Sequence, residues 1–487
     1  MSADSKSISS DEYLSSSAPA VVQLSRRDNR ALTRIIFWMT LPVFFEHILG
    51  LLVSTSDFLI TGKFLMKEHL AAVCSAGYVV WGIQSVFCFV SVGATAMTAR
   101  YIGGGAPQKA NLAMHQAFNI GLALTVLTMT IWCLFSTQIV SGLHLEGEAG
   151  SLAAQYLWIV IPTTPLIMIT AVGTASLRGA GNMACGLWVM IAVNIVNILA
   201  SWGLATGLCG LPNLGFVGVA LGTTSGFVVG AVVTLILTIR GSYGMKIQWR
   251  MFKPQWRVIG QLLWISVPAG VDMMTIIGCQ LWFLGLINSL GVAASAVHGV
   301  ALRVESWGFA PLNAFSITAT TLVGQFLGAK KPEMAVRSTY IIMILAAAFS
   351  VCACSVYYFG AEITPYLFLK SNQTSLARAC VPLLKLIAYC SPACVVMMTL
   401  SGALRGAGDT RIPMVISLIG FLFVRISLTY ILAFDQFSLF GIEALTFRGL
   451  NMGVTGAWIG MTTDITVRGM LLLGHFCQGR WKQIAIE

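Results

Sequence analysis

The pentapeptide Leu-Arg-Gly-Ala-Gly occupies residues 177–181 and occurs again at residues 404–408, which is 404 − 177 = 227 positions later. A second pair of matching positions, Pro42 and Pro268, lies 226 residues apart, so the two matches share nearly one offset. Separate matches at one offset indicate that a unit of roughly half the chain has been duplicated.

Both copies of this unit are strongly apolar. Of the 487 residues, 57% are hydrophobic and only 10% are charged, whereas a soluble domain carries about 25% charged residues. A single soluble core stops growing near 250–300 residues, so burying this much apolar surface requires lipid. The composition therefore predicts an all-α polytopic membrane protein.

The apolar residues are arranged in runs that are long enough to cross a bilayer, which requires about 20 mostly apolar residues. Breaks that contain Gly or Pro separate the runs. The twelve runs are residues 34–60, 70–98, 112–137, 151–173, 184–208, 216–239, 259–287, 293–322, 337–360, 379–402, 413–434 and 451–475. Because six fall in each copy, we expect twelve transmembrane helices in two homologous six-helix lobes.

These runs divide the chain into five segments. We expect a polar cytoplasmic N-terminal tail (1–33) and a basic cytoplasmic linker (241–258) between the lobes. The N-terminal lobe covers 34–240 and the C-terminal lobe 259–475, and a cytoplasmic C-terminal tail follows at 476–487.

Positive charge is distributed unevenly between the two sides of the predicted bundle. With both termini in the cytoplasm, 20 of the 29 lysines and arginines lie on the cytoplasmic side, five lie opposite and four fall within helices. This bias predicts a multi-pass protein of the cell membrane, or of the inner membrane in a bacterium, with both termini cytoplasmic. The net charge of +11 then faces anionic headgroups, so no nucleic acid partner is expected.

Several motifs together carry a resemblance to a known family. They are Ser56-Asp57-Phe58, ALRVES (301–306), LRGAGDTRIP (404–413) and GVTGAWIGM (453–461). Because these motifs occur together and in this order, the chain resembles a multidrug and toxic compound extrusion (MATE) transporter over about residues 34–482. The resemblance implies a secondary active antiporter that works by alternating access. It would export organic, cationic amphipathic compounds in exchange for H⁺ or Na⁺.

The sequence contains no GxxxxGK[ST] phosphate-binding motif, so an ion gradient is the expected energy source. We expect no enzymatic activity, no cofactor or metal beyond the coupling ion, and a monomer whose partners are a small drug-like molecule and the bilayer. Two alternatives remain. A lipid-linked oligosaccharide flippase of the same superfamily would need clustered Arg or Lys for diphosphate, and an integral membrane transferase would need paired acids for Mg²⁺. The sequence contains neither pattern.

An ion-coupled exporter needs a group whose charge changes during the cycle. An ionised carboxylate inside a bilayer is costly, so an embedded acid can take up and release a proton near neutral pH. The predicted helices contain five acids: Glu46, Asp57, Asp272, Glu305 and Asp464.

Asp57 is the first candidate for cation coupling, because it matches the aspartate that the family uses in its first helix. Glu46 and Asp272 are further candidates, since they are repeat equivalents that each lie four residues after a proline. A proline frees a backbone carbonyl one turn earlier, and a polar group could line that opening. The alternative for all three acids is structural hydrogen bonding between helices.

Four polar residues are candidates for lining the substrate cavity: Asn194, Asn197, Arg303 and His298. Asn197 matches an asparagine that one branch of the family follows with an aspartate four residues later, but Ser201 stands at that position. We expect Arg303 to pair across helices, with Asp272 as a candidate partner. Packing between helices is the alternative for the asparagines and for His298.

The remaining charged candidates have gating or structural roles. Arg178 and Arg405, in the two LRGAG segments, could cap helix ends or hold a cytoplasmic gate. Asp464 and Arg468 are four residues apart and can form an ion pair across one helical turn. With Arg425 they are expected to form a charge network toward the cytoplasmic end of the bundle.

Overall fold

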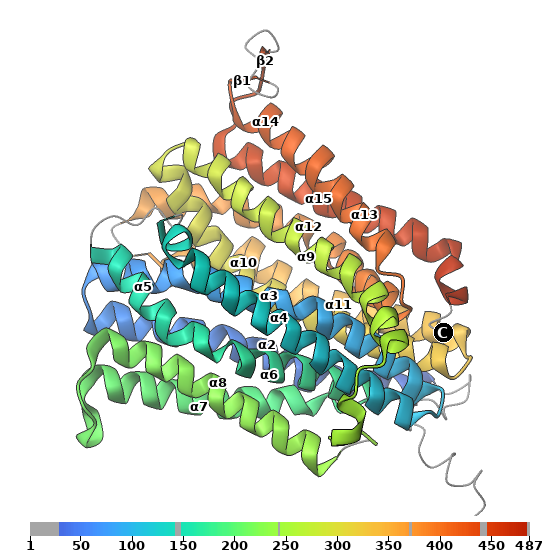
Figure 1. Cartoon of the computed structure of the whole chain (residues 1–487). Coiled ribbons are helices and arrows are strands. Elements are labelled where there is room, and N and C mark those ends of the chain that lie inside the picture. The colour runs from blue at the N-terminus through green and yellow to red at the C-terminus, as the bar shows by residue number, and fades with distance from the viewer. Residues whose placement is uncertain (1–28, 142–147, 242–243, 370–372, 439–445, 485–487) are drawn as a thin grey trace, which may run out of the picture.

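The computed structural model describes residues 29–141, 148–241, 244–369, 373–438 and 446–484. Almost all of them are helical, and the long helices run side by side in one bundle (Figure 1). Most of the predicted N-terminal tail lies outside the described residues, and α2 already begins at Asn29. The helices extend beyond the predicted apolar runs because hydropathy marks only the part of a helix that meets lipid.

The first half of the chain forms six spans. They are α2 (Asn29–Phe64), α3 (Lys67–Gly103), α4 (Pro107–Ser141), α5 (Glu148–Val160) continued through η1 (Ile161–Thr163) into α6 (Thr164–Gly179), α7 (Ala184–Thr206) and α8 (Gly215–Arg240). Pro162 and Pro165 lack the N–H groups that a continuous helix needs, which accounts for the short 3₁₀ turn inside the fourth span.

The second half repeats this plan. Its spans are α9 (Trp256–Ser289), α10 (Val292–Gly328), α11 (Pro332–Phe359), α12 (Thr374–Gly406), α13 (Arg411–Ile419) continued through the π-helical η5 (Gly420–Ile426) into α14 (Ser427–Ala433), and α15 (Gly453–Gln478). Corresponding helices of the two halves begin in the same way, because Pro107 is in the first turn of α4 and Pro332 is in the first turn of α11. Proline fits there because its missing N–H has no partner in a first turn.

The predicted twelve-helix fold in two homologous lobes is confirmed. Within the described ranges, ten spans are long and apolar enough to cross a membrane by length and composition. The other two, α10 and α15, are also long but carry charged side chains in their middles. One element was not predicted, a two-stranded hairpin of β1 (Gln436–Ser438) and β2 (Thr446–Arg448) between α14 and α15.

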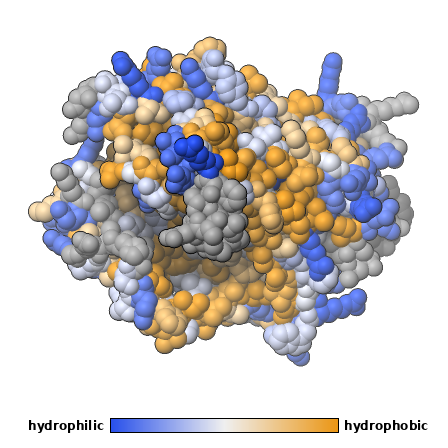
Figure 2. All heavy atoms as spheres, turned by 90° about the horizontal axis from the view of Figure 1, so that it is seen from above, coloured by the Kyte–Doolittle hydropathy of each residue, from blue (hydrophilic) through white to orange (hydrophobic). Residues whose placement is uncertain are grey.

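The surface of the bundle fits a lipid environment. Large apolar side chains such as Trp188, Ile344, Phe423 and Met470 are each at least 60% exposed. Figure 2 shows a face on which hydrophobic side chains form broad patches, with hydrophilic side chains gathered mainly toward its margins. Monomeric soluble proteins rarely expose apolar patches of this extent.

Each lobe has its own apolar core, and the first helix of each half begins in the core of the other lobe. The core of the first lobe extends to Leu262 and Ile265 at the start of α9. The core of the second lobe includes Leu32 and Ile36 at the start of α2. This reciprocal crossing brings the middle of α2 and of α9 close to the boundary between the lobes.

The lobes are closed against each other at the end of the bundle where α2 begins and α15 ends, which we call the terminal end. A Cβ added to Gly103 would lie 2.0 Å from the Gln325 carbonyl oxygen, and one added to Gly328 would lie 2.1 Å from that of Arg100. Glycine alone permits this backbone approach. The side chain of Gln325 also donates a 3.1 Å hydrogen bond to the Gly179 carbonyl. We call the opposite end, which carries β1 and β2, the hairpin end.

Candidate cation and substrate site

Asp57 lies on α2 toward the hairpin end, and its side chain is buried. Its carboxylate accepts three hydrogen bonds from neutral donors. The Thr223 hydroxyl on α8 donates at 2.9 Å. On α7, the Asn197 amide and the Ser201 hydroxyl each donate at 3.3 Å. Asn197 and Ser201 are four residues apart, so both side chains lie on the face of α7 that meets α2.

A second layer of hydroxyl groups supports these donors. Tyr156 on α5 is hydrogen-bonded to the Thr223 hydroxyl at 3.2 Å. Ser56 donates a 3.3 Å hydrogen bond to the side-chain oxygen of Asn197. Gly222 makes the cluster possible, since a Cβ there would lie 2.0 Å from the Ser201 hydroxyl oxygen. Four helices thus surround Asp57 with oxygen-bearing groups that suit a proton or a small hard cation.

Among the described residues, Asp57 has no ion-pair partner, whereas Glu46 and Asp272 each have one. Glu46 on α2 pairs with Arg178 near the end of α6. Asp272 on α9 pairs with Arg405 near the end of α12, at 2.7 Å. The two ion pairs are repeat equivalents, because 272 − 46 = 226 and 405 − 178 = 227.

The expected pairing of Arg303 with Asp272 was therefore wrong. Arg405 occupies that position because the last turn of α12 lies beside the middle of α9. The Arg303 guanidinium lies over the ring of Phe58, 4.9 Å from its centroid. Arg303 belongs to α10 and Phe58 to α2, so this contact joins the two lobes beside Asp57.

Two other residues predicted for the cavity are packed between helices. The Asn194 amide donates to the carbonyl oxygens of Leu49 at 3.1 Å and Met190 at 2.8 Å, which ties α7 to α2. His298 accepts a 3.1 Å hydrogen bond from the Trp458 indole. These contacts match the packing alternative, and a role of either side chain in binding substrate stays a prediction.

The expected charge network of Arg425, Asp464 and Arg468 is present. Arg425 donates at 3.0 Å and Arg468 at 2.9 Å to the Asp464 carboxylate, and Arg425 also donates at 3.0 Å to Gln280. Its expected place toward the cytoplasmic end was wrong. Asp464 lies eleven residues after Gly453 and fourteen before Gln478, near the middle of α15. Three helices meet near the middle of the bundle. The spacing of residues along one helix could not predict where the network lies along the bundle.

Three members of the Asp57 cluster were not predicted: Ser201, Thr223 and Tyr156. The spacing of Ser201 from Asn197 was an available signal, because residues four apart share a helix face. Thr223 and Tyr156 gave no signal in the sequence, since hydroxyl groups are common in membrane helices and most bond to their own backbone.

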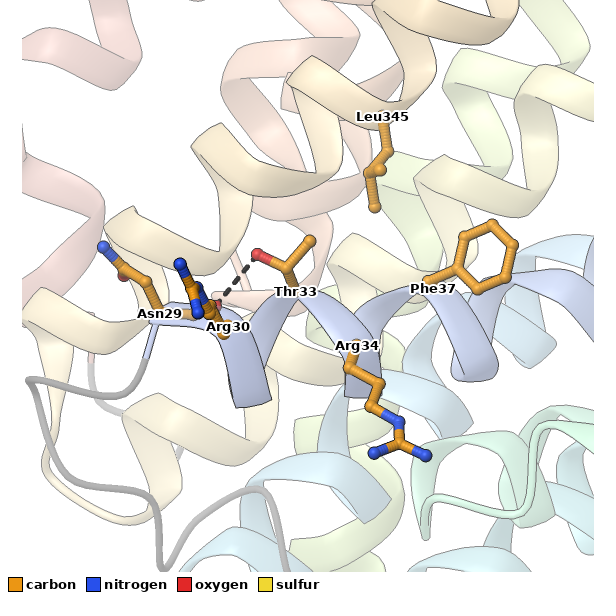
Figure 3. Close-up of a pocket in the computed structure, with 6 residues that line it drawn as sticks. All are labelled: Asn29, Arg30, Thr33, Arg34, Phe37 and Leu345. Carbon is orange, nitrogen blue, oxygen red and sulfur yellow. Dashed lines mark hydrogen bonds between the residues drawn. The ribbon is translucent and has the colours of Figure 1, made fainter.

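A surface groove of about 440 Å³ lies at the terminal end, between the start of α2 and Leu345 of α11. Figure 3 shows that Arg34 projects away from Leu345, on the other side of α2. Asp57 follows Arg34 by 23 residues, about 35 Å at the helical rise of ~1.5 Å per residue. The groove is thus separate from the Asp57 cluster.

The family of the chain follows from a match over both halves. The family model described as MatE matches residues 42–202 and again residues 268–431. The two matched segments start 226 residues apart, which is the offset of the internal repeat. The chain belongs to the MATE family. Members of this family are multidrug efflux transporters of the membrane rather than enzymes, so the predicted family and class of protein are confirmed.

Individual relatives cover nearly the whole chain. The chain is 27% identical over 453 residues to the "Probable multidrug resistance protein NorM" of Thermotoga maritima, covering 92% of this chain and 93% of the relative. It is 25% identical to the "Uncharacterized transporter YisQ" of Bacillus subtilis, covering 92% and 95%. A solved MOP superfamily transporter from Pyrococcus furiosus superposes with a TM-score of 0.83 at 20% identity, covering 96% of this chain and 100% of the other. This last similarity shows the fold.

Proposed function

We propose that the chain is a secondary active antiporter that exports organic, cationic amphipathic compounds in exchange for H⁺ or Na⁺. The names of the curated multidrug resistance relatives support export of drug-like compounds, and the resemblance to the family suggests that these are cationic and amphipathic. The observation that carries the coupling mechanism is the carboxylate of Asp57, buried among neutral donors and without a cation partner in the described part of the chain.

Most of the other embedded acids differ from Asp57 because they are paired with arginines. Three of the five, Glu46, Asp272 and Asp464, are neutralised by arginines. A buried charge that has lost its hydration needs a compensating partner. In the described part of the chain, the hydrogen-bond donors to the Asp57 carboxylate are all neutral, so binding H⁺ or Na⁺ supplies the missing charge. Release of that cation is then linked to the arrangement of α2, α7 and α8.

The distribution of contacts between the lobes supports alternating access. The lobes are in close backbone contact at the terminal end, and Asp57 lies toward the opposite end. We assign the terminal end to the cytoplasm, since it carries most of the lysines and arginines. The substrate would reach the site from the cytoplasm only after the contact around Gly103 and Gln325 separates.

The two repeat-equivalent ion pairs are placed to take part in this separation. Arg178 precedes Gly179, whose carbonyl binds Gln325 across the closed contact. Arg405 precedes Gly406, which lies close to the Thr320 carbonyl oxygen of α10 within the second lobe, one turn before Gln325. Protonation of Glu46 or Asp272 would remove the charge that holds its arginine, so both acids act in coupling through these arginines.

Substrate binding uses the polar groups at the boundary of the lobes. Asn197 contacts Asp57 directly, and Arg303 lies over Phe58, the residue next to Asp57. Asn194 and His298 become available when α2 and α10 move. The flippase alternative needs clustered cations for diphosphate. Arg425 and Arg468 lie together but are both held by Asp464, whereas Arg303 and Lys385 contact rings on different helices.

The test is ethidium efflux from drug-sensitive cells that carry the full chain, with the H⁺ and Na⁺ gradients collapsed separately. We expect efflux to stop when one gradient is removed, and Asp57→Asn to abolish coupled efflux. Asp435→Asn is the matched control, because Asp435 is exposed after α14. Normal pumping by Asp57→Asn would overturn the coupling mechanism, and absence of efflux from the wild type would overturn the proposed substrate class.

A further inference from the structure

Within the described residues, Glu305 is the second embedded acid that forms no ion pair with an arginine. It lies on α10 and lines a small cavity of about 20 Å³ inside the second lobe. A cavity that holds one water molecule needs a volume of about 10–15 Å³. The space beside the carboxylate is thus large enough for about one water.

The cavity is built by three packed helices. Each contributes residues at helical spacing, which places them on one face. The lining residues are Glu305, Gly308, Phe309 and Leu312 of α10, Phe349, Ser350, Ala353 and Tyr357 of α11, and Ile387, Ser391 and Cys394 of α12. Apart from Glu305, only Ser350, Tyr357 and Ser391 in this lining carry a side-chain oxygen atom.

The polar groups of the lining are engaged elsewhere. Tyr357 donates a 3.0 Å hydrogen bond to the backbone carbonyl of Glu305, and Gly308 leaves room for its hydroxyl. Ser391 donates to the Ile387 carbonyl at 3.0 Å, and the Ser350 hydroxyl lies 3.9 Å from the Cys354 sulfur. In the described ranges no group donates a hydrogen bond to the Glu305 carboxylate.

The charged side chains on the helices around Glu305 also contact other groups. Arg425 is held by Asp464 and Gln280. Lys385 of α12 lies 5.4 Å from the ring centroid of Tyr358. The remaining titratable neighbours are the Tyr357 hydroxyl and the thiols of Cys354, Cys390 and Cys394.

Glu305 is not a repeat copy of Asp57. The equivalent of Asp57 in the second half is Phe283, because 57 + 226 = 283, and the equivalent of Glu305 in the first half is Val79, because 305 − 226 = 79. The two copies therefore do not share this acid, and within the described residues each lobe carries one embedded acid without an arginine partner, on a different helix.

We propose that Glu305 is a proton-binding site of the second lobe, which takes up one H⁺ to become a neutral carboxylic acid that hydrogen-bonds to a water in the cavity. A proton is favoured over Na⁺ because a hard metal cation needs several oxygen ligands, and the lining supplies few. The inference rests on the proposed exchange of cargo for a cation. It identifies a second group that binds the exchanged cation. The same group returns the proton to water when the lobe rearranges.

The test measures protonation directly, without transport. The purified full chain in lipid nanodiscs is titrated over pH while infrared difference spectra record the C=O band of protonated carboxyl groups. We expect a titrating band in the wild type that is lost in Glu305→Gln and kept in Asp57→Asn. Glu362→Gln is the matched control, because Glu362 is exposed in the turn after α11.

A band that is unchanged in Glu305→Gln would overturn the inference, as would loss of the Glu305-dependent band when Na⁺ is added at constant pH. Thermal melting and ethidium binding of Glu305→Gln serve as the check of folding. Glu305→Asp keeps a carboxyl group and is expected to retain a titrating band, which keeps the test valid if Glu305→Gln misfolds. Because no step depends on efflux, failure here is distinguishable from failure of the proposed function.

Discussion

Arg405 donates a 2.7 Å hydrogen bond to Asp272, and this ion pair links the last turn of α12 to the middle of α9. Its equivalent in the first half links Arg178 to Glu46. Both arginines belong to the repeated LRGAG segment, and both acids lie one turn after a helix proline. The duplication has thus preserved a contact between two helices as well as a sequence motif.

Removing one partner of this ion pair is expected to destabilise the protein more than removing both. Asp272→Asn leaves the Arg405 guanidinium without its counter-charge, and breaking a buried pair in this way costs about 3–5 kcal/mol. The double variant Asp272→Asn/Arg405→Gln leaves no unpaired charge. Thermal melting in detergent should therefore show a larger decrease for the single variant, and equal decreases would contradict a direct interaction.

The hydrogen bond from Thr223 should be needed for Asp57 to release its cation, because a donor stabilises the ionised carboxylate. Thr223→Val has nearly the same shape but removes the 2.9 Å donor, a loss of about 1.5–3 kcal/mol for a bond to a charged group. We expect ethidium efflux to decrease by about tenfold or more, since 1.4 kcal/mol is a factor of ten. Thr223→Ser should restore it.

The matched control for Thr223 is Thr130→Val. Thr130 is exposed on α4 and bonds only to a carbonyl of its own helix, so its loss should leave efflux unchanged. Efflux by Thr223→Val at the wild-type rate would show that Asp57 needs no donor from α8.

The close backbone contact at the terminal end should control which conformation the protein occupies. Gly103→Ala would place a methyl group 2.0 Å from the Gln325 carbonyl oxygen, so the closed contact must separate. We expect amide hydrogen exchange at the ends of α3 and α10 to become faster. In Gly285→Ala, the added methyl on α9 meets nothing within 4 Å, and exchange should stay as in the wild type.

Asp464 should matter for the stability of the second lobe, because it is the shared partner of two arginines. In Asp464→Asn, Arg425 and Arg468 lose their counter-charge, and both guanidinium groups lie close to the ring of Phe421. We expect a lower melting temperature and poor recovery of folded protein. Restoration by Asp464→Glu would support the charge requirement, and normal stability of Asp464→Asn would exclude it.

The sequence alone determined the membrane class, the number of spans and the duplication. These features depend on composition and on local periodicity, because a span must be apolar along about 20 residues wherever it packs. The ion pair of Asp464 and Arg468 was also predictable, since four residues along one helix fix their distance. Asp57 could be selected as a candidate because its motif is local.

Only the tertiary structure decided which of the embedded acids are neutralised. Glu46 meets Arg178 across 132 residues and Asp272 meets Arg405 across 133, whereas Asp57 and Glu305 have no such partner in the described residues. These pairings depend on how helices pack laterally, and the apolar pattern that fixes each helix does not specify its rotation against a neighbour. The sequence therefore predicts which acids are embedded, and the packing of the lobes determines which of them remain free to bind a cation.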